Sequence, residues 1–198
     1  MRITLYHLRQ GLLDSDYNPH YAAGRGGYPT TTSALSAAVR LYHAEGLEAA
    51  QKQLNIGLSG YFARQGSPTG KARVAHENFD RYVALAERDE REVFGTNYRM
   101  DLSIRQHELS VQADVLLFDP DGYAGRVLLW GADAQSLTLT QLQLLATPVI
   151  LAMQEELGED RVVGTDIWQI RSEQITTINA EQTDIDLLVG LLNRWSTP

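Results

Sequence analysis

The segment from His107 to Ala132 constrains the fold of this chain more than any other stretch. Hydrophobic residues first alternate with polar ones, then run without a break from Val115 to Phe118, and return as a short run after the sequence Asp-Pro-Asp-Gly. Alternation is typical of a half-buried strand, and Asp-Pro-Asp-Gly is a strong turn signal. The segment therefore predicts two strands joined by a tight turn, with one acidic residue, Asp114, inside the first strand.

A long amphipathic pattern follows the two strands and predicts a helix over Leu139–Leu157. Its hydrophobic residues recur three or four positions apart, which is the spacing of one helix face. Thr138 or Ser136 is expected to cap the start of this helix, and Gly158 is expected to end it. Because Pro148 lies inside the pattern, we expect the helix to be kinked or divided there.

Three further strands complete the predicted sheet. One precedes the pair, at residues 98–106, and two follow the long helix, at 162–170 and 174–178, before an amphipathic helix at 184–195. The order β-β-β-α-β-β indicates the α/β class, with α+β as the alternative. We expect a mixed central sheet of about five strands with flanking helices.

Residues 1–97 have mostly helical patterns, although residues 1–13 fit either a short strand or a first helical turn. The predicted helices run from Thr32 or Ser33 to Gly46, over 47–54, and from 71 to about 94. A break is expected at 55–60, and Gly95 to Asn97 are expected to end the helical region. We therefore expect a helical N-terminal region, 1–97, that packs on a core formed by 98–198 within one compact domain.

Residues 14–32 are rich in Gly, Pro, Asn and Tyr, which indicates a loop. The glycines at 24–27 lack the spacing of a nucleotide-binding fingerprint, so a surface loop is favoured. The alternative is a segment that covers a groove, with Arg25 and the tyrosines facing a ligand. In that case the chain would be a small-molecule or peptide binding protein.

The composition excludes several kinds of site. The chain has no cysteine, which excludes disulfides, thiolate catalysis and cysteine-ligated metal centres. The net charge is −8, of which residues 1–97 contribute +1 and residues 98–198 contribute −9. Binding to a phosphate backbone requires clustered Lys and Arg, so the acidic C-terminal half disfavours nucleic acid as a partner unless the fold assembles a local basic patch.

The hydrophobic segments are too short to suggest a membrane protein. No run approaches the roughly 18 residues of a membrane-spanning helix. The first residues lack the apolar region and the cleavage site of a signal peptide. We therefore expect a cytoplasmic protein that has no membrane partner.

The surroundings of Asp114 resemble the PD-(D/E)XK nuclease superfamily, in particular its RecB- and Cas4-like branch. In that family a strand with an acidic residue leads through a turn to a strand carrying an acidic residue, any residue and lysine, and then to a helix with a Gln-x-x-x-Tyr motif. Here Leu109–Asp114 resembles the first strand, Val127–Gly131 occupies the position of the second, and Gln141–Leu145 stands at the helix motif. The resemblance covers residues 98–178 and implies a restriction-endonuclease-like core.

The resemblance also implies a chemistry that this sequence carries only in part. Such nucleases hold Mg²⁺ with two carboxylates, and a neighbouring lysine stabilises the charge of the transition state. If Asp114 is the first catalytic carboxylate and metal ligand, the second carboxylate position is Leu129 and the lysine position is Gly131. No lysine follows Lys71 in the sequence.

Other residues are candidates for the missing groups. Asp133 is a candidate for a displaced catalytic carboxylate, and Arg126 or Arg171 is a candidate for the cation. His76 is a candidate for the catalytic histidine that the family often has in an upstream helix. Arginine is a poor replacement for lysine where a compact charge is needed.

The favoured hypothesis is a catalytically degraded PD-(D/E)XK-like protein, a binding or scaffolding component of a nucleic-acid-processing or phage-defence assembly. It is expected to need no cofactor and to have a protein partner. Its candidate binding residues are Arg25, Arg126, Gln141 and Trp130. The alternative is an active nuclease with a rearranged site, which would require Mg²⁺ or Mn²⁺.

Overall fold

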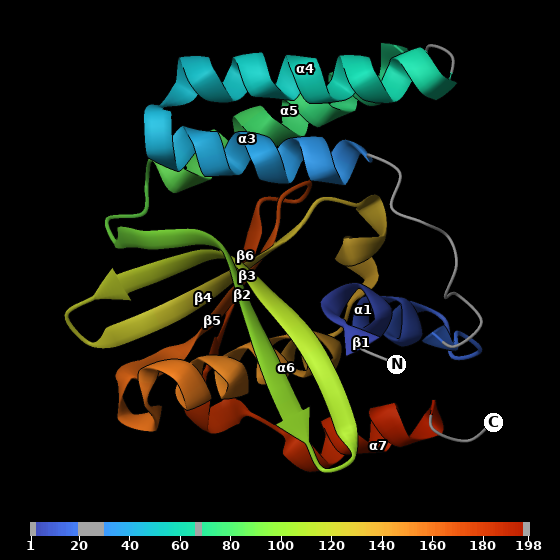
Figure 1. The fold of residues 1–198 in the computed structure, drawn as a ribbon, viewed down its shortest axis with the longest axis vertical. Helices are drawn as coiled ribbons and strands as arrows, with labels where there is room; N and C mark the ends of the chain where they lie inside the picture. Colours follow the sequence, from blue (N-terminus) through green and yellow to red (C-terminus); the bar gives the residue numbers. More distant parts are fainter. Residues whose placement is uncertain (1–2, 20–29, 66–68, 196–198) are drawn as a thin grey trace.

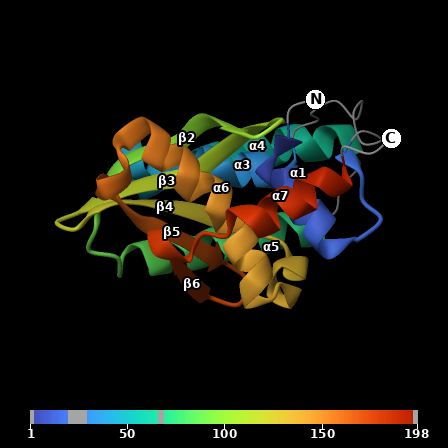
Figure 2. The same ribbon diagram turned by 90° about the horizontal axis from the view of Figure 1, so that it is seen from below.

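A computed structural model describes residues 3–19, 30–65 and 69–195. Over these residues the chain has a mixed α/β fold, in which a six-stranded sheet lies between two layers of helices (Figures 1 and 2). The strands are β1 (Ile3–Thr4), β2 (Glu92–Ile104), β3 (His107–Asp119), β4 (Gly122–Leu129), β5 (Val162–Gln169) and β6 (Gln174–Asn179).

The sheet is built around β3. Strands β2, β3 and β4 are antiparallel neighbours, β4 pairs in parallel with β5, and β6 returns antiparallel to β5. The crossover from β4 to β5 contains the long helix, which a parallel pair requires. The predicted order β-β-β-α-β-β is confirmed, and the Asp119–Gly122 turn joins β3 to β4 as expected.

Helices cover both faces of the sheet. Helices α3, α4 and α5 cover one face, whereas α1, α6 and α7 lie on the other (Figures 1 and 2). The helices are α1 (Leu5–Leu13), α3 (Thr31–Glu45), α4 (Leu47–Gln65), α5 (Thr69–Ala86), α6 (Leu139–Leu157) and α7 (Ile185–Arg194). None of these helices in the described ranges is long and apolar enough to cross a membrane.

Strand β4 is buried on both faces, as its apolar run predicts. Val127 and Leu129 face α6, whereas Ala124 and Leu128 face the layer of α3, α4 and α5. Two hydrophobic cores therefore share the sheet.

Helix α6 has the predicted boundaries. The hydroxyl of Thr138 accepts a hydrogen bond from the backbone N–H of Gln141 and caps its start, and Gly158 ends it with a φ of 99°. The sequence predicts a kink or a division at Pro148. The helix is not divided, since α6 continues through Pro148 as one helix. Residues 144–150 are buried on all sides, so tertiary packing holds the turn that lacks one backbone donor.

The first helices differ from the prediction. Residues 1–13 contain both alternatives, since β1 pairs with β3 and Thr4 then caps α1. Helix α3 starts after the cap Thr30, two or three residues before the expected caps.

The break expected at 55–60 is wrong, because α4 continues to Gln65. Gly57 is tolerated inside α4 because a Cβ there would lie 2.8 Å from the Cβ of Ala34.

The helix predicted to reach residue 94 ends at Ala86, and β2 begins at Glu92. Gly95 to Asn97 do not interrupt this strand as expected. A β-bulge lies between Val93 and Gly95, and Asn97 adopts a φ of 53°, so the strand absorbs the irregularity and continues to Ile104.

Candidate functional site

The candidate site lies where β3 changes partners. Along one edge β3 pairs first with β1, at Leu109 and Ser110, and then with β4, from Val115 onward. Between these two pairings β1 and β4 diverge, so the sheet opens into a fork. Asp114 stands at the base of this fork, one residue before the β3–β4 pairing begins.

Backbone and side-chain donors fix the carboxylate of Asp114. Its Oδ2 accepts a hydrogen bond from the backbone N–H of Leu128 at 2.8 Å, which substitutes for a β3–β4 backbone bond. Its Oδ1 accepts from the Nε2 of Gln112 at 3.3 Å, and the same Nε2 donates to Asn97 Oδ1 at 2.9 Å. The bulged part of β2 therefore contributes indirectly to the orientation of Asp114.

The environment of Asp114 disfavours its charge. Burial raises the pKa of Asp114 to about 6, although the hydrogen bonds from Leu128 and Gln112 act in the opposite direction. The carboxyl group is therefore mostly ionised at pH 7, but it is held in a place that does not favour ionisation. Such a perturbed carboxyl beside a cavity is a typical feature of functional sites.

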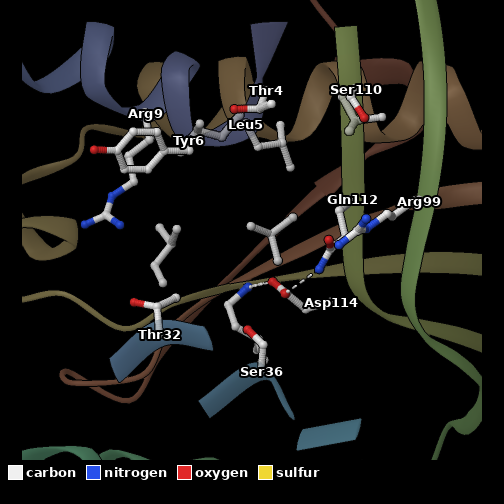
Figure 3. A pocket seen from close by; sticks show the side chains of 15 residues that line it. Thr4, Leu5, Tyr6, Arg9, Thr32, Ser36, Arg99, Ser110, Gln112 and Asp114 are labelled. Carbon is white, nitrogen blue, oxygen red and sulfur yellow. Dashed lines mark hydrogen bonds between the residues drawn. The ribbon is translucent and has the colours of Figure 1, made fainter. Parts of the chain in front are cut away.

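A cavity of about 440 Å³ opens beside Asp114 (Figure 3). Its volume falls in the range of about 300–1,000 Å³ that small-molecule pockets occupy. Its walls come from the fork, from α1 and from the start of α3. Its polar lining residues are Thr4, Tyr6, Arg9, Thr32, Ser36, Arg99, Ser110, Gln112 and Asp114, and its apolar ones are Leu5, Val111, Val127, Leu128, Leu129 and Leu145.

The side chains are arranged on three sides of this cavity (Figure 3). Gln112 and Arg99 lie beside Asp114, Tyr6 and Arg9 lie on the side of α1, and α3 contributes Thr32 and Ser36.

The cavity does not provide a ligand set for a divalent cation. Asp114 is the single carboxylate among its lining residues, and the facing residues of β4, Val127 to Leu129, are apolar. In the described ranges no cluster of three or more His, Asp or Glu side chains could hold a metal. Mg²⁺-dependent hydrolysis requires converging oxygen ligands, so the lining residues do not fit that metal.

The structure places Asp133 outside the cavity. Asp133 lies in the short 3-10 helix Ala132–Ser136 and forms an exposed ion pair with Arg9. Arg9 reaches the cavity, whereas Asp133 is not among its lining residues. The structure therefore does not place Asp133 with Asp114 in the cavity.

Arg126 lies on the face of β4 that α3, α4 and α5 cover, but it does not line the cavity. Its side chain is buried, its guanidinium stacks 3.6 Å from the ring of Trp168, and it pairs with Asp89. Arg91 joins the same network by bonding Asp89 at 2.8 Å and Asp166 at 2.5 Å. This network links the segment after α5 to strands β4 and β5.

The network changes the ionisation of Asp89. Burial alone would raise the pKa of Asp89, but hydrogen bonds from Arg91 and the charges of Arg126 and Arg91 lower it to about 2. Arg126, which takes part in this network, is buried and does not line the cavity. We assign it a role in stability.

Gln141 and Trp130 also have structural contacts. The Oε1 of Gln141 accepts from the backbone N–H of Thr138, and its Nε2 donates to the carbonyl of Leu12 at 2.7 Å. It thereby ties α6 to the end of α1. Trp130 is buried against Tyr82, with ring centroids 6.0 Å apart, and accepts through its carbonyl from Asn78.

The remaining candidates lie elsewhere. His76 is half-buried on α5 and is not among the residues that line the Asp114 cavity. Arg171 lies in the β5–β6 turn and lines a second cavity, described below. Arg25 lies outside the described residues.

Two further cavities adjoin the first along α3. One shares Ser36, Arg99 and Gln112 with it and adds Arg40. The other shares Thr32 with it, lies at the starts of α3 and α5, and is about 530 Å³ in volume. We call the three cavities together the α3 groove.

The α3 groove is basic although the chain is acidic. Asp114 is its single acidic lining residue. Its basic lining residues are Arg9, Arg40, Lys71, Arg73, Arg99 and Arg171. Arg9 pairs with Asp133 and Arg73 with Glu77, whereas no ion pair of the other four occurs in the part of the chain that the structure describes.

Sequence reasoning missed most of these residues. Arg99 lies in the strand predicted at residues 98–106, but a strand pattern does not say what packs opposite an exposed side chain. The convergence of Arg9, Arg40 and Arg99 depends on the packing of α1 and α3 beside the fork. The more positive charge of residues 1–97 relative to 98–198 is a signal for Arg9 and Arg40, but not for Arg99.

Comparisons with known proteins add information about the fold alone. No protein-family model matches the sequence, and no curated protein matches it. The crystal structure of a "putative exonuclease" from Eubacterium rectale has a similar fold, with a TM-score of 0.56 at 11% identity, over 98% of this chain and 77% of that one. The crystal structure of SSO0001 aligns with a TM-score of 0.41 at 12% identity, over 96% of this chain and 84% of that one.

Proposed function

We propose that this protein is a catalytically degraded member of the PD-(D/E)XK nuclease-like fold that binds nucleic acid without cleaving it. The α3 groove carries this proposal. It combines six basic side chains with one acidic side chain on a protein whose net charge is −8. The similarity in fold to the exonuclease structure supports the choice of class.

The loss of cleavage follows from the composition of the fork. The position of Asp114 on the central hairpin corresponds to the first carboxylate of the nuclease pattern. The neighbouring strand offers Val127, Leu128 and Leu129 toward the cavity, where a second carboxylate and a lysine would be needed. A single carboxylate would hold Mg²⁺ poorly and would leave the attacking water without activation.

Binding of a phosphate backbone follows from the charge of the groove. Arg40, Arg99, Lys71 and Arg171 are exposed and have no ion-pair partner in the described ranges, so their charges are available to phosphates. The starts of α3 and α5 also line one end of the groove. Backbone N–H groups at helix starts favour anions and add to the side-chain charge.

Fluorescence anisotropy with labelled single- and double-stranded oligonucleotides tests this proposal. We expect binding that weakens steeply with salt, because each phosphate contact releases a counterion. The variant pair Arg40→Glu and Arg99→Glu should reduce affinity at least tenfold. The matched control is Arg88→Glu, since Arg88 is an exposed arginine that follows α5, away from the groove.

Two results would contradict the proposal. Binding that is absent, or equal in the groove variants and the control, would remove the nucleic-acid part. Cleavage that depends on Mg²⁺ or Mn²⁺ and that Asp114→Ala abolishes would remove the catalytically degraded part and favour the active nuclease.

The scaffolding part of the hypothesis rests on a different surface. Phe94 and Phe118 are 58% and 39% exposed, and their rings lie 5.3 and 5.1 Å from that of Tyr123. Exposed aromatic clusters often form the centres of protein interfaces. A protein partner that binds the wild type should not bind the double variant Phe94→Ser/Phe118→Ser. The control variant Leu139→Ser should still bind that partner. If the double variant also binds it, this surface is not the interface.

A further inference from the structure

We propose that the cavity beside Asp114 holds an unpaired guanine base of the bound strand. The inference deepens the proposed function and rests on it, because the α3 groove would carry the backbone that delivers the base. It assigns a base preference to a protein whose backbone contacts alone would give none.

The hydrogen-bonding capacity of Asp114 selects guanine. An ionised carboxylate offers about four acceptor positions. In Asp114 each oxygen already accepts one hydrogen bond, from Leu128 and from Gln112, so each oxygen retains capacity for another. Guanine presents two adjacent N–H donors, N1–H and the 2-amino group, which match the two oxygens. Adenine, cytosine and uracil place an acceptor beside each donor on the same edge, so one of the two contacts would be repulsive.

The volume and the lining of the cavity suit a heterocyclic base. Beyond Asp114 its walls include Val111, Val127, Leu129 and Leu145, which are apolar. Tyr6 lines the cavity and is 62% exposed as a residue, and its ring provides a surface on which a base can stack (Figure 3).

The charges around the cavity exclude the other partners that a carboxylate could hold. A guanidinium or ammonium group would also pair with Asp114, but it would lie beside Arg99, for which the described ranges show no ion pair. A neutral base with an anionic tail avoids this repulsion. Arg99 lies beside Gln112 and Asp114, where its N–H groups can serve the O6 acceptor or the phosphate of the same nucleotide (Figure 3).

Binding of mononucleotides to the unmodified protein gives the first test. In isothermal titration calorimetry we expect GMP to bind more tightly than IMP, which lacks the 2-amino group, by about tenfold or more. AMP and CMP should bind more weakly than IMP. Equal affinities for the four nucleotides, or no binding of GMP at millimolar concentration, would overturn the inference.

The substitution Asp114→Asn gives the second test. The amide donates from one atom and accepts at the other, so it matches xanthine, which carries a keto oxygen in place of the 2-amino group. The variant should lose affinity for GMP by about tenfold and bind XMP more tightly than the wild type does. Asp80→Asn, an exposed carboxylate on α5, should leave both affinities unchanged.

The two proposals fail in different ways. If labelled oligonucleotides bind through Arg40 and Arg99 but a single guanine and a single inosine bind equally, the guanine site is wrong and the proposed function stands. If GMP is selected but oligonucleotides do not bind, the proposed function is wrong and the site serves a free nucleotide. An unchanged GMP affinity in a folded Asp114→Asn variant would also reject the guanine site.

Discussion

Asp114 combines hydrogen bonds that fix its carboxylate with burial that opposes its charge. It is placed where a backbone hydrogen bond between β3 and β4 is missing, and its carboxylate is fixed by Leu128 and Gln112. Burial nevertheless raises its pKa to about 6, so its ionised form opposes folding. This cost agrees with the ligand-binding role that we propose for Asp114.

This property gives a prediction for stability against pH. Since the pKa of Asp114 is higher in the folded protein than in the unfolded chain, folding takes up a proton between about pH 4 and 6, and stability falls as the pH rises through this window. Asp114→Asn removes the cost of ionisation. At pH 7 to 8 we expect it to raise the free energy of unfolding by about 1–2 kcal/mol, after allowance for partial exposure.

Urea unfolding at pH 4 and at pH 7.5 measures the effect. The free energy of unfolding of Asp114→Asn should be close to that of the wild type at pH 4. It should exceed the wild-type value increasingly as the pH rises toward 7.5. Asp80→Asn should show no comparable trend. A difference that shrinks with rising pH would show that ionised Asp114 stabilises the fold.

Arg126 shows the opposite behaviour for a buried charge. Its replacement by Met keeps much of the volume beside Trp168 but removes one of the two arginines that serve Asp89. Breaking a buried ion pair from one side costs about 3–5 kcal/mol. We expect a loss of this size in urea unfolding, while Arg88→Met changes stability by about 0.5 kcal/mol or less. A loss equally small in Arg126→Met would contradict the role assigned to the network.

At the scale of elements, the sequence predicts the hairpin, α6 and the two last strands because each has one strong local signal. The alternation in β3, the Asp-Pro-Asp-Gly turn and the capping threonine Thr138 are examples. The errors arise where tertiary contacts override such signals. Gly57 does not break α4 because it packs on Ala34, and the charged residues after Ala86 leave the helix to join the ion-pair network.

The fork could not be predicted in the same way. Asp114 is visible in the sequence as an acidic residue inside a strand. The approach of Arg9 and Arg99 requires that β1 adds to β3 and that β2 continues past its bulge. Both depend on pairings between distant segments, for which a single sequence has no local pattern.

Gln141 connects two elements and provides a prediction for them. Its side chain accepts from the start of α6 and donates to the carbonyl of Leu12 at the end of α1. Gln141→Ala removes both bonds, and we expect a loss of about 1–2 kcal/mol.

Hydrogen exchange locates that loss. The amides of α1 should exchange faster in Gln141→Ala, whereas those of β5 should change only with global stability. Gln135→Ala, at an exposed position before α6, is the control. Unchanged protection of α1 would show that α1 is held by its hydrophobic contacts alone.

At the scale of the whole molecule, the distribution of charge is more informative than its sum. The net charge of −8 disfavours nucleic acid, but the fold gathers Arg40, Arg99, Lys71 and Arg171 along α3. The expectation that residues 98–198 disfavour nucleic acid rests on their summed charge, whereas two of the groove cations, Arg99 and Arg171, lie in those residues.

The salt dependence of binding reports this arrangement. The logarithm of the association constant should fall linearly with the logarithm of the salt concentration. In Lys71→Glu this slope should be shallower by about one unit. The control is Lys52→Glu, the same change at the other lysine of the chain, which lies on α4. It should leave the slope unchanged. Equal slopes in both variants would place the phosphate contacts elsewhere.

One measurement tests the central claim most directly: a labelled single-stranded oligonucleotide is incubated with the protein in Mg²⁺ or Mn²⁺, and binding and chain length are followed together. We predict salt-dependent binding that Arg40→Glu with Arg99→Glu weakens, and an oligonucleotide that stays intact. Metal-dependent cleavage that is lost in Asp114→Ala would contradict the account, and so would the absence of binding.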